Sequence, residues 1–262
     1  MKVHFAGYAA HRQALDRAGI RYVLESFYEM RTMASVRLAE VIRSMNSKPH
    51  AIIDSGLFTL MFGAKSSTEL TEQLIEQWQD EYANIITSSG FIHSVVECDV
   101  QKKLSPEFAW EMRKKFKTQV KNEIINVYHL EDGNPDKLID HSSYIAVSIP
   151  ELRIAVSRKE RDRITEYIAT RAIRKGKKVH LLGCTEKWML KKYSFCTTCD
   201  STSWMSSTKY GGVTKFPSVG KEIPIGSIKR NRIKDFNQGA SDDYWQSVFW
   251  LRAYESIVGD QS

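Results

Sequence analysis

Apolar runs of strand length alternate with helix-like stretches along this chain of 262 residues. Each run is short enough for one buried strand, and the stretches between them have helical periodicity. The eight runs are 2–7, 21–28, 51–58, 94–100, 123–130, 144–151, 178–183 and 195–200. Parallel strands need such crossover connections. The alternation predicts a (β/α)8 barrel, with a doubly wound open sheet as the alternative.

Eight helices are expected from the same pattern: 10–19, 34–45, 67–86, 105–120, 134–141, 157–176, 185–193 and 241–259. Ser67 or Thr68 would cap the helix over 67–86. Ser105 would cap the following helix, with Pro106 at its first position. Ser241 would open the last one, ahead of two aspartates.

One domain spanning 1–262 accommodates this pattern, with an irregular insertion or loop region at 205–240 that is rich in Gly, Ser, Thr and Lys. Hydrophobic residues make up 42% of the chain, and no linker separates two cores. The polar N-terminus and the absence of a long apolar run predict a cytoplasmic protein without a membrane partner. We interpret the cysteines, Cys98, Cys184, Cys196 and Cys199, as reduced.

Charge favours a polyanionic partner. The chain has 38 Lys and Arg against 31 Asp and Glu, a formal charge of +7, and its basic residues gather late, in 153–163, 171–180, 186–192 and 225–234. Such runs could present positive potential to phosphates. The alternative is that each is a solvated helix face.

Polar residues stand where the predicted strands end, which in such a barrel is the face that carries function. They are Asp54, then Glu97 and Asp99, His129, Ser148 and Glu151, Gly183, and Asp200. Asp-Ser-Gly at 54–56 is also common turn chemistry, and its glycine would let backbone approach a ligand. The sequence predicts that three aspartates, Asp54, Asp99 and Asp200, converge on one pocket.

Other chemistries lack their residues. Cys196 and Cys199 have zinc-ligand spacing, but no second pair follows, and two extended residues at this spacing would point to opposite faces. We therefore expect no metal and no cofactor. The motifs of metalloproteases, P-loop hydrolases, dinucleotide enzymes and serine hydrolases are absent from the sequence. Paired carboxylates without a metal suit displacement at the anomeric carbon of a sugar.

The order DSGLF, VECDV, VHLLG and CDSTSW, over positions 51 to 204, resembles the tRNA-guanine transglycosylase superfamily. It is most similar to the phage-type members that insert deazaguanine bases into DNA. The resemblance implies that Asp200 is the nucleophile, that Asp54 is the general acid/base and that Asp99 reads the base. It also implies substrate contacts for a further set of residues, namely Ser55, Gly56, His129, Ser148 and Gly183.

Departures from that family guide the choice of substrate. The strand-six Gly-Gly stretch is AVSIPE here, STSW follows the strand-eight motif, and the family's zinc cluster is missing. These features favour DNA over tRNA as the partner, with a 7-deazaguanine as the small-molecule substrate, and leave a homodimer possible. Trp204 and Tyr210 would stack on a flipped base or pack in the core. The alternatives are a tRNA-guanine transglycosylase, a nucleoside or glycoside hydrolase using the same carboxylates, and a barrel that only binds nucleic acid.

Overall fold

A computed structural model of the chain describes residues 1–62, 70–184, 186–205 and 236–261. All eight predicted strands form, and each pairs in parallel with the next until β8 returns to β1, which closes the barrel. The strands are β1 (Lys2–Ala6), β2 (Tyr22–Ser26), β3 (His50–Asp54), β4 (Ser94–Val96), β5 (Ile124–Tyr128), β6 (Tyr144–Ser148), β7 (Lys178–Leu182) and β8 (Thr198–Ser201). The (β/α)8 prediction is therefore confirmed, and the open sheet is excluded.

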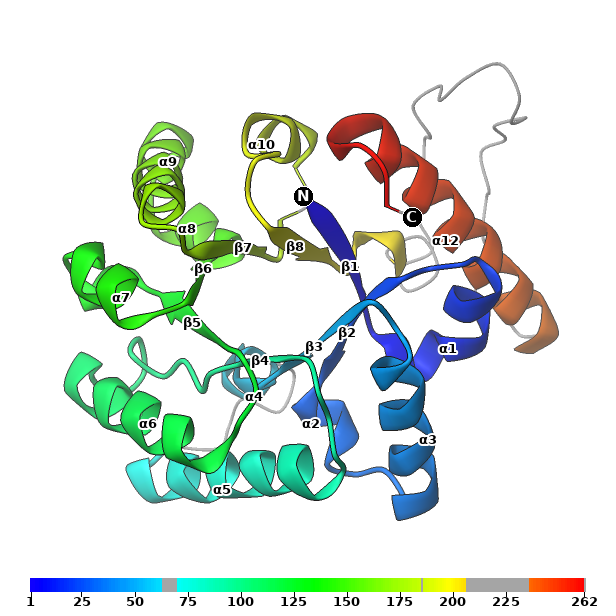
Figure 1. Ribbon diagram of the computed structural model, residues 1–262, viewed down its shortest axis with the longest axis horizontal. Helices are drawn as coiled ribbons and strands as arrows, with labels where there is room; N and C mark the ends of the chain where they lie inside the picture. Colours follow the sequence, from blue (N-terminus) through cyan, green and yellow to red (C-terminus); the bar gives the residue numbers. More distant parts are fainter. Residues whose placement is uncertain (63–69, 185, 206–235, 262) are drawn as a thin grey trace.

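Helices surround the strands in Figure 1 and cover the outside of the barrel. The helices that the sequence predicted are α1 (Tyr8–Arg17), α3 (Ser35–Asn46), α5 (Glu72–Ser88), α6 (Pro106–Gln119), α7 (Pro135–His141), α9 (Arg158–Arg174), α10 (Lys187–Lys192) and α12 (Phe236–Val258). Shorter elements follow the strand ends: α2 (Phe27–Met30), α4 (Leu57–Phe62), the 3₁₀ turn η1 (Leu130–Asp132), α8 (Ile149–Ala155) and η2 (Ser203–Met205). These short elements were not predicted from the sequence, because each is too brief to show a helical period.

One predicted helix start is confirmed, and two need correction. Ser105 caps α6 as expected, accepting a hydrogen bond from the backbone N–H of Phe108 at 3.1 Å. The cap of α5 is Thr71, whose Oγ1 accepts from Leu74 N–H at 3.2 Å, so the helix starts later than 67. The predicted caps Ser67 and Thr68 lie outside the described residues. The last helix begins before Ser241, at Phe236, so the end of the expected 205–240 irregular region is helical; most of that region is not described.

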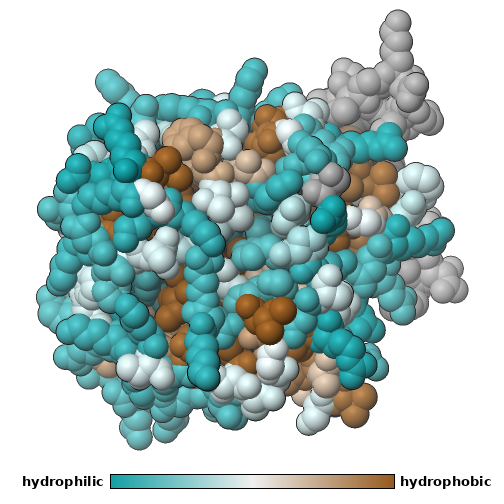
Figure 2. Space-filling view, viewed as in Figure 1, coloured by the Kyte–Doolittle hydropathy of each residue, from teal (hydrophilic) through white to brown (hydrophobic). Residues whose placement is uncertain are grey.

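The main hydrophobic core lies between the barrel and its helices. Strand residues such as Val3, Ile53 and Val179 pack there against apolar helix faces, as burial of alternate strand residues on the outer side of a barrel requires. Figure 2 shows hydrophilic residues over most of the visible face, with separate small apolar patches. Among the described helices, none has both the length and the apolar character to cross a bilayer.

Candidate active site

The first carboxylate of the site stands where β3 ends. Asp54 is partly buried, and its Oδ2 accepts a long hydrogen bond of 3.3 Å from the backbone N–H of Gly56. Trp78 holds the same turn by donating its Nε1–H to the carbonyl of Ser55 at 3.0 Å. Gly56 has φ +71°, and a Cβ there would come within 2.6 Å of the backbone nitrogen of Tyr28. Packing therefore explains this glycine, and its contact with substrate stays a prediction.

Asp200 lies near the end of β8 and is 7% exposed. Its Oδ1 accepts a 2.7 Å hydrogen bond from the backbone N–H of Gly183 and lies 3.2 Å from Nε2 of His180. Gly183 has φ +60°, and a Cβ there would come within 2.6 Å of Pro150 Cγ. The structure thus gives the Gly183 N–H to Asp200, in a turn that only glycine adopts without strain.

Asp99 and Asp200 both lie close enough to Asp54 for their charges to act on it, and that the three line one pocket stays a prediction. Burial raises the pKa of Asp54 to about 7, and the negative charges of Asp99 and Asp200 add to the rise. Hydrogen bonds from the backbone N–H groups of Gly56 and Ser55 oppose it only in part. A carboxyl group with this pKa can hold a proton at neutral pH and also release it, which is what a general acid/base needs.

Asp99 belongs to a second cluster, in which His129 lies between two carboxylates. His129 Nε2 is 2.9 Å from Asp99 Oδ2, and its Nδ1 is 2.6 Å from Glu151 Oε2. Burial alone would lower the pKa of His129, but the hydrogen bonds and charges of Asp99 and Glu151 outweigh it and raise the pKa to about 10. The ring is therefore an imidazolium at neutral pH.

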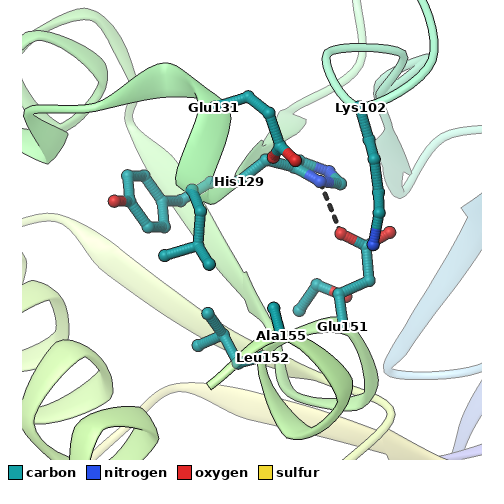
Figure 3. Close-up of a pocket in the computed structure, with 9 residues that line it drawn as sticks. Lys102, His129, Glu131, Glu151, Leu152 and Ala155 are labelled. Atoms are coloured by element: carbon teal, nitrogen blue, oxygen red, sulfur yellow. Dashed lines mark ion pairs between the residues drawn. The ribbon is translucent and has the colours of Figure 1, made fainter.

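A small pocket opens beside this cluster, between the ends of β5 and β6 (Figure 3). His129, Ser148 and Glu151 line it, and Figure 3 shows the ion pair between His129 and Glu151 at its rim. Lys102, from the loop after β4, points toward the Glu151 carboxylate in this view. Glu151 was expected at a strand end and lies instead in the first turn of α8. The pocket therefore combines charged groups with apolar side chains of α8.

Asp99, His129 and Glu151 also offer ligand atoms that lie within 4.8 Å of one another. A metal would need a lone pair on one ring nitrogen of His129. Nε2 already makes a hydrogen bond with Asp99, and Nδ1 lies 2.6 Å from Glu151 Oε2 without a hydrogen bond of good geometry. The raised pKa of the ring favours a proton on each nitrogen. The geometry fits a charged hydrogen-bond cluster rather than a metal centre.

A buried ion network stands behind the site, and its central residue was not predicted from the sequence. Arg113 on α6 donates to Glu97 Oε1 at 2.8 Å and to Asp132 Oδ1 at 3.1 Å. Asp132 in turn accepts from the backbone N–H of His129 at 3.0 Å. Glu97 thus serves this network rather than the aspartates. The missed signal is that Arg113 lies on the apolar stripe of α6, three residues before buried Phe116.

Two other predicted residues have clear surroundings. Ser55 is 1% exposed, and its Oγ has no hydrogen-bond partner among the described residues. Trp204 is fully buried and donates its Nε1–H to the carbonyl of Ala6 at 3.1 Å, so of its two expected roles it packs in the core. Tyr210 lies outside the residues that the structure describes.

Several residues of the late basic runs form ion pairs on the outside of the barrel. Lys192 of α10 contacts Asp162 at 2.8 Å and Glu166 at 3.0 Å, and Lys178 contacts Glu123 at 2.8 Å. These pairs fit the interpretation of the runs as solvated helix faces. The run at 225–234 lies outside the described residues.

Comparison with known proteins supports the fold alone. A mandelate oxidase mutant, Y128F, solved with a C4a-OH-FMN adduct, superposes with a TM-score of 0.52 at 13% identity, over 100% of this chain and 76% of the other. The same mutant with (S)-mandelic acid gives 0.44 at 12% identity, over 95% and 69%. CdNal from Clostridium difficile in complex with mannosamine gives 0.46 at 10% identity, over 77% and 70%. The last two scores are too low to support any conclusion.

No protein-family model and no curated protein matches the chain. The expected membership of the transglycosylase superfamily is therefore contradicted, since neither comparison returns that family and the solved structure that superposes above a TM-score of 0.5 is that of a mandelate oxidase. The expected exchange of guanine in DNA for a deazaguanine is overturned with it. The motifs misled because a carboxylate at a strand end, followed by a glycine turn, is a general way to build a site on this fold. What is shown is a (β/α)8 barrel with a cluster of carboxylates at its mouth.

Proposed function

We propose that the chain is an enzyme that uses Asp54 and Asp200 for general acid/base catalysis on a small substrate at the mouth of the barrel. The observation that carries this proposal is the pKa of Asp54, raised to about 7 by burial and then by Asp99 and Asp200. A buried carboxyl group with this pKa lowers the stability of the fold when it is ionised, and it can transfer protons at neutral pH.

The surroundings of the two carboxyl groups suggest a division of roles. Asp200 accepts a 2.7 Å hydrogen bond from the Gly183 N–H, which stabilises its ionised form. Asp54 has the longer bond of 3.3 Å from Gly56 and keeps a proton more readily. We assign Asp54 as the group that gives a proton to the substrate, and Asp200 as the carboxylate that accepts a proton from it or faces the positive charge that develops on it.

Substrate class follows from the hydrogen-bonding character of the site. Carboxylates accept hydrogen bonds and cannot donate them when ionised, and the one buried cation of the Asp99 cluster, His129, is already enclosed by Asp99 and Glu151. The unpartnered hydroxyl of Ser55 adds a group that can accept or donate. We infer a neutral or cationic substrate that carries N–H or O–H donors, which would leave these acceptors paired.

The FMN in the mandelate oxidase structure finds no support here. Barrels commonly bind a phosphate at the loops after strands seven and eight. Among the described residues, the ends of β7 and β8 present Asp200, whose charge would repel a phosphate. No catalytic step is therefore assigned to a flavin.

A nucleic-acid partner and a homodimer remain proposals. The first rests on the net charge of +7, and it concerns the outer surface rather than the acidic mouth. A gel-shift assay with duplex and single-stranded DNA and with tRNA, repeated at rising salt, tests it.

The catalytic proposal is tested by screening the purified chain against small donor-rich compounds (amino sugars, amides, ureas and lactams) and following product by NMR. For any compound turned over, Asp54→Asn and Asp200→Asn should each lower kcat by about 100-fold or more. Asp80→Asn, on the outer face of α5, is the matched control and should leave kcat unchanged. Activity should fall as the pH rises above about 7, because Asp54 loses its proton there. Turnover that survives in both variants would refute the assignment.

A further inference from the structure

The interior of this barrel is unusually polar beneath the candidate site. Barrel interiors are normally filled by branched apolar side chains. Here His4, His180, Tyr144 and Thr198 are all buried, at 0%, 0%, 1% and 5% exposure. Burying polar groups costs free energy unless they are hydrogen-bonded to one another. The arrangement of these groups therefore calls for a functional explanation.

The hydrogen bonds among three of them lead in one direction, toward Asp200. Tyr144 on β6 shares a hydrogen bond with Thr198 Oγ1 on β8. Thr198 Oγ1 lies 2.7 Å from Nδ1 of His180 on β7, and Nε2 of His180 lies 3.2 Å from Asp200 Oδ1. If Tyr144 donates to Thr198 and Thr198 donates to Nδ1, the proton of the neutral ring must be on Nε2, where it meets the carboxylate.

We propose that His180 is a positioning residue for Asp200, held in its Nε2–H tautomer by a hydrogen-bond relay from Tyr144 through Thr198. The relay points the Nε2–H of His180 at the same oxygen that accepts from the Gly183 N–H. Oδ1 of Asp200 therefore accepts two hydrogen bonds, and Oδ2 is left for the substrate. Its role in catalysis rests on the proposed function of Asp200, while the hydrogen-bond relay itself does not.

The histidines near His180, namely His4 and His50, favour their neutral forms. The titratable groups that face His180 are Asp200 on β8, Tyr144 on β6, His4 on β1 and, more distantly, His50 on β3. Burial lowers the pKa of His4, and the nearby His50 lowers it further. Burial likewise lowers the pKa of His50, to about 4. The hydrogen bonds of His180 therefore decide its role, and its Nε2 faces Asp200 at 3.2 Å.

The experiment combines NMR with near-isosteric variants. Long-range ¹H–¹⁵N spectra report which ring nitrogen of His180 carries the proton, and ¹³C-labelled aspartate reports the titration of Asp200. The Asp200→Asn spectrum assigns its signal. In the wild-type chain the Nε2–H tautomer should dominate. Thr198→Val removes the hydroxyl at nearly constant volume, so the two tautomers should become mixed and the titration midpoint of Asp200 should rise by about one pH unit.

Thr198→Ser keeps the hydroxyl and should restore both readouts. Tyr144→Phe removes only the first group of the relay, should give a smaller shift in the same direction, and serves if Thr198→Val does not fold. A dominant Nδ1–H tautomer in the wild-type chain, or an Asp200 midpoint that is the same in all folded variants, would overturn the relay. Neither readout needs a substrate. An intact relay without any detectable turnover would therefore count against the proposed function alone.

Discussion

Two carboxyl groups on consecutive strand ends, Glu97 and Asp54, are surrounded in opposite ways. Glu97 receives two hydrogen bonds from Arg113, at 2.8 and 3.0 Å, and another from the backbone of Val127 at 2.8 Å. Burial raises the pKa of both carboxyl groups. The charge of Arg113 and these hydrogen bonds oppose the rise at Glu97. Among the described residues Asp54 has no cationic partner, and its pKa rises to about 7 under burial and two negative neighbours. A buried charge that is fully paired supports the fold, whereas one left unpaired is retained at a cost to stability. The contrast separates structural from functional carboxylates in this site.

Replacing Arg113 should have the largest effect on stability. Arg113→Ala leaves Glu97 and Asp132 buried without their counter-ion and should lower the free energy of unfolding by about 3–5 kcal/mol. Urea denaturation followed by circular dichroism measures the change. The control Arg163→Ala removes an exposed arginine paired with Glu160 and should leave the free energy of unfolding nearly unchanged. Similar losses in the two variants would end the distinction between structural and functional carboxylates.

The cluster of Asp99, His129 and Glu151 at the mouth of the barrel tests the contrast between paired and unpaired buried charges. Because the folded pKa of His129 is raised from 6.5 to about 10, the stability it contributes is fully present below about pH 6.5 and is lost as the pH rises through 10. His129→Gln should lower the free energy of unfolding by about 2 kcal/mol at pH 6 and by less at pH 10. Unfolding measured at both values checks this, with His141→Gln on α7 as the control. A loss that does not depend on pH would show that His129 is not the charged partner.

Asp54→Asn should change stability in the opposite direction. The folded pKa of Asp54 is raised, so its protonated form stabilises the fold at low pH, and that contribution is lost as the pH rises through about 7. Asparagine cannot ionise. The variant should be close to the wild-type chain in stability at pH 4 and exceed it by up to about 4 kcal/mol at pH 9, because each unit of raised pKa corresponds to about 1.4 kcal/mol. Thermal unfolding across this range gives the difference, and a variant less stable at every pH would mean that the carboxylate is satisfied after all.

The barrel was predictable because its signal repeats. Each strand is a short apolar run. In the run at 51–58, strand β3 ends at Asp54, whose polar side chain lies at the C-terminal face of the barrel. The convergence of Asp54, Asp99 and Asp200 followed from topology alone, since all parallel strands end at the same face. Strand ends therefore indicated a candidate site before any contact was known.

Partners across the barrel could not be predicted in the same way. That Asp200 would meet Gly183 and His180, and that Arg113 would reach Glu97, depends on register and on which face of a helix is buried. The family resemblance failed for a related reason. Motifs such as DSGLF record a turn that packs against Tyr28, and the same turn can serve many chemistries.

The hydrogen bond from Gly183 to Asp200 has a consequence for how this site can change by mutation. Its donor is the main chain, so substitutions elsewhere in the loop leave it in place as long as the loop keeps its path. Only proline removes the N–H, and proline cannot adopt the φ of +60° found there. The support of Asp200 is thus encoded by the course of the backbone, and it can outlast extensive drift of the side chains around it.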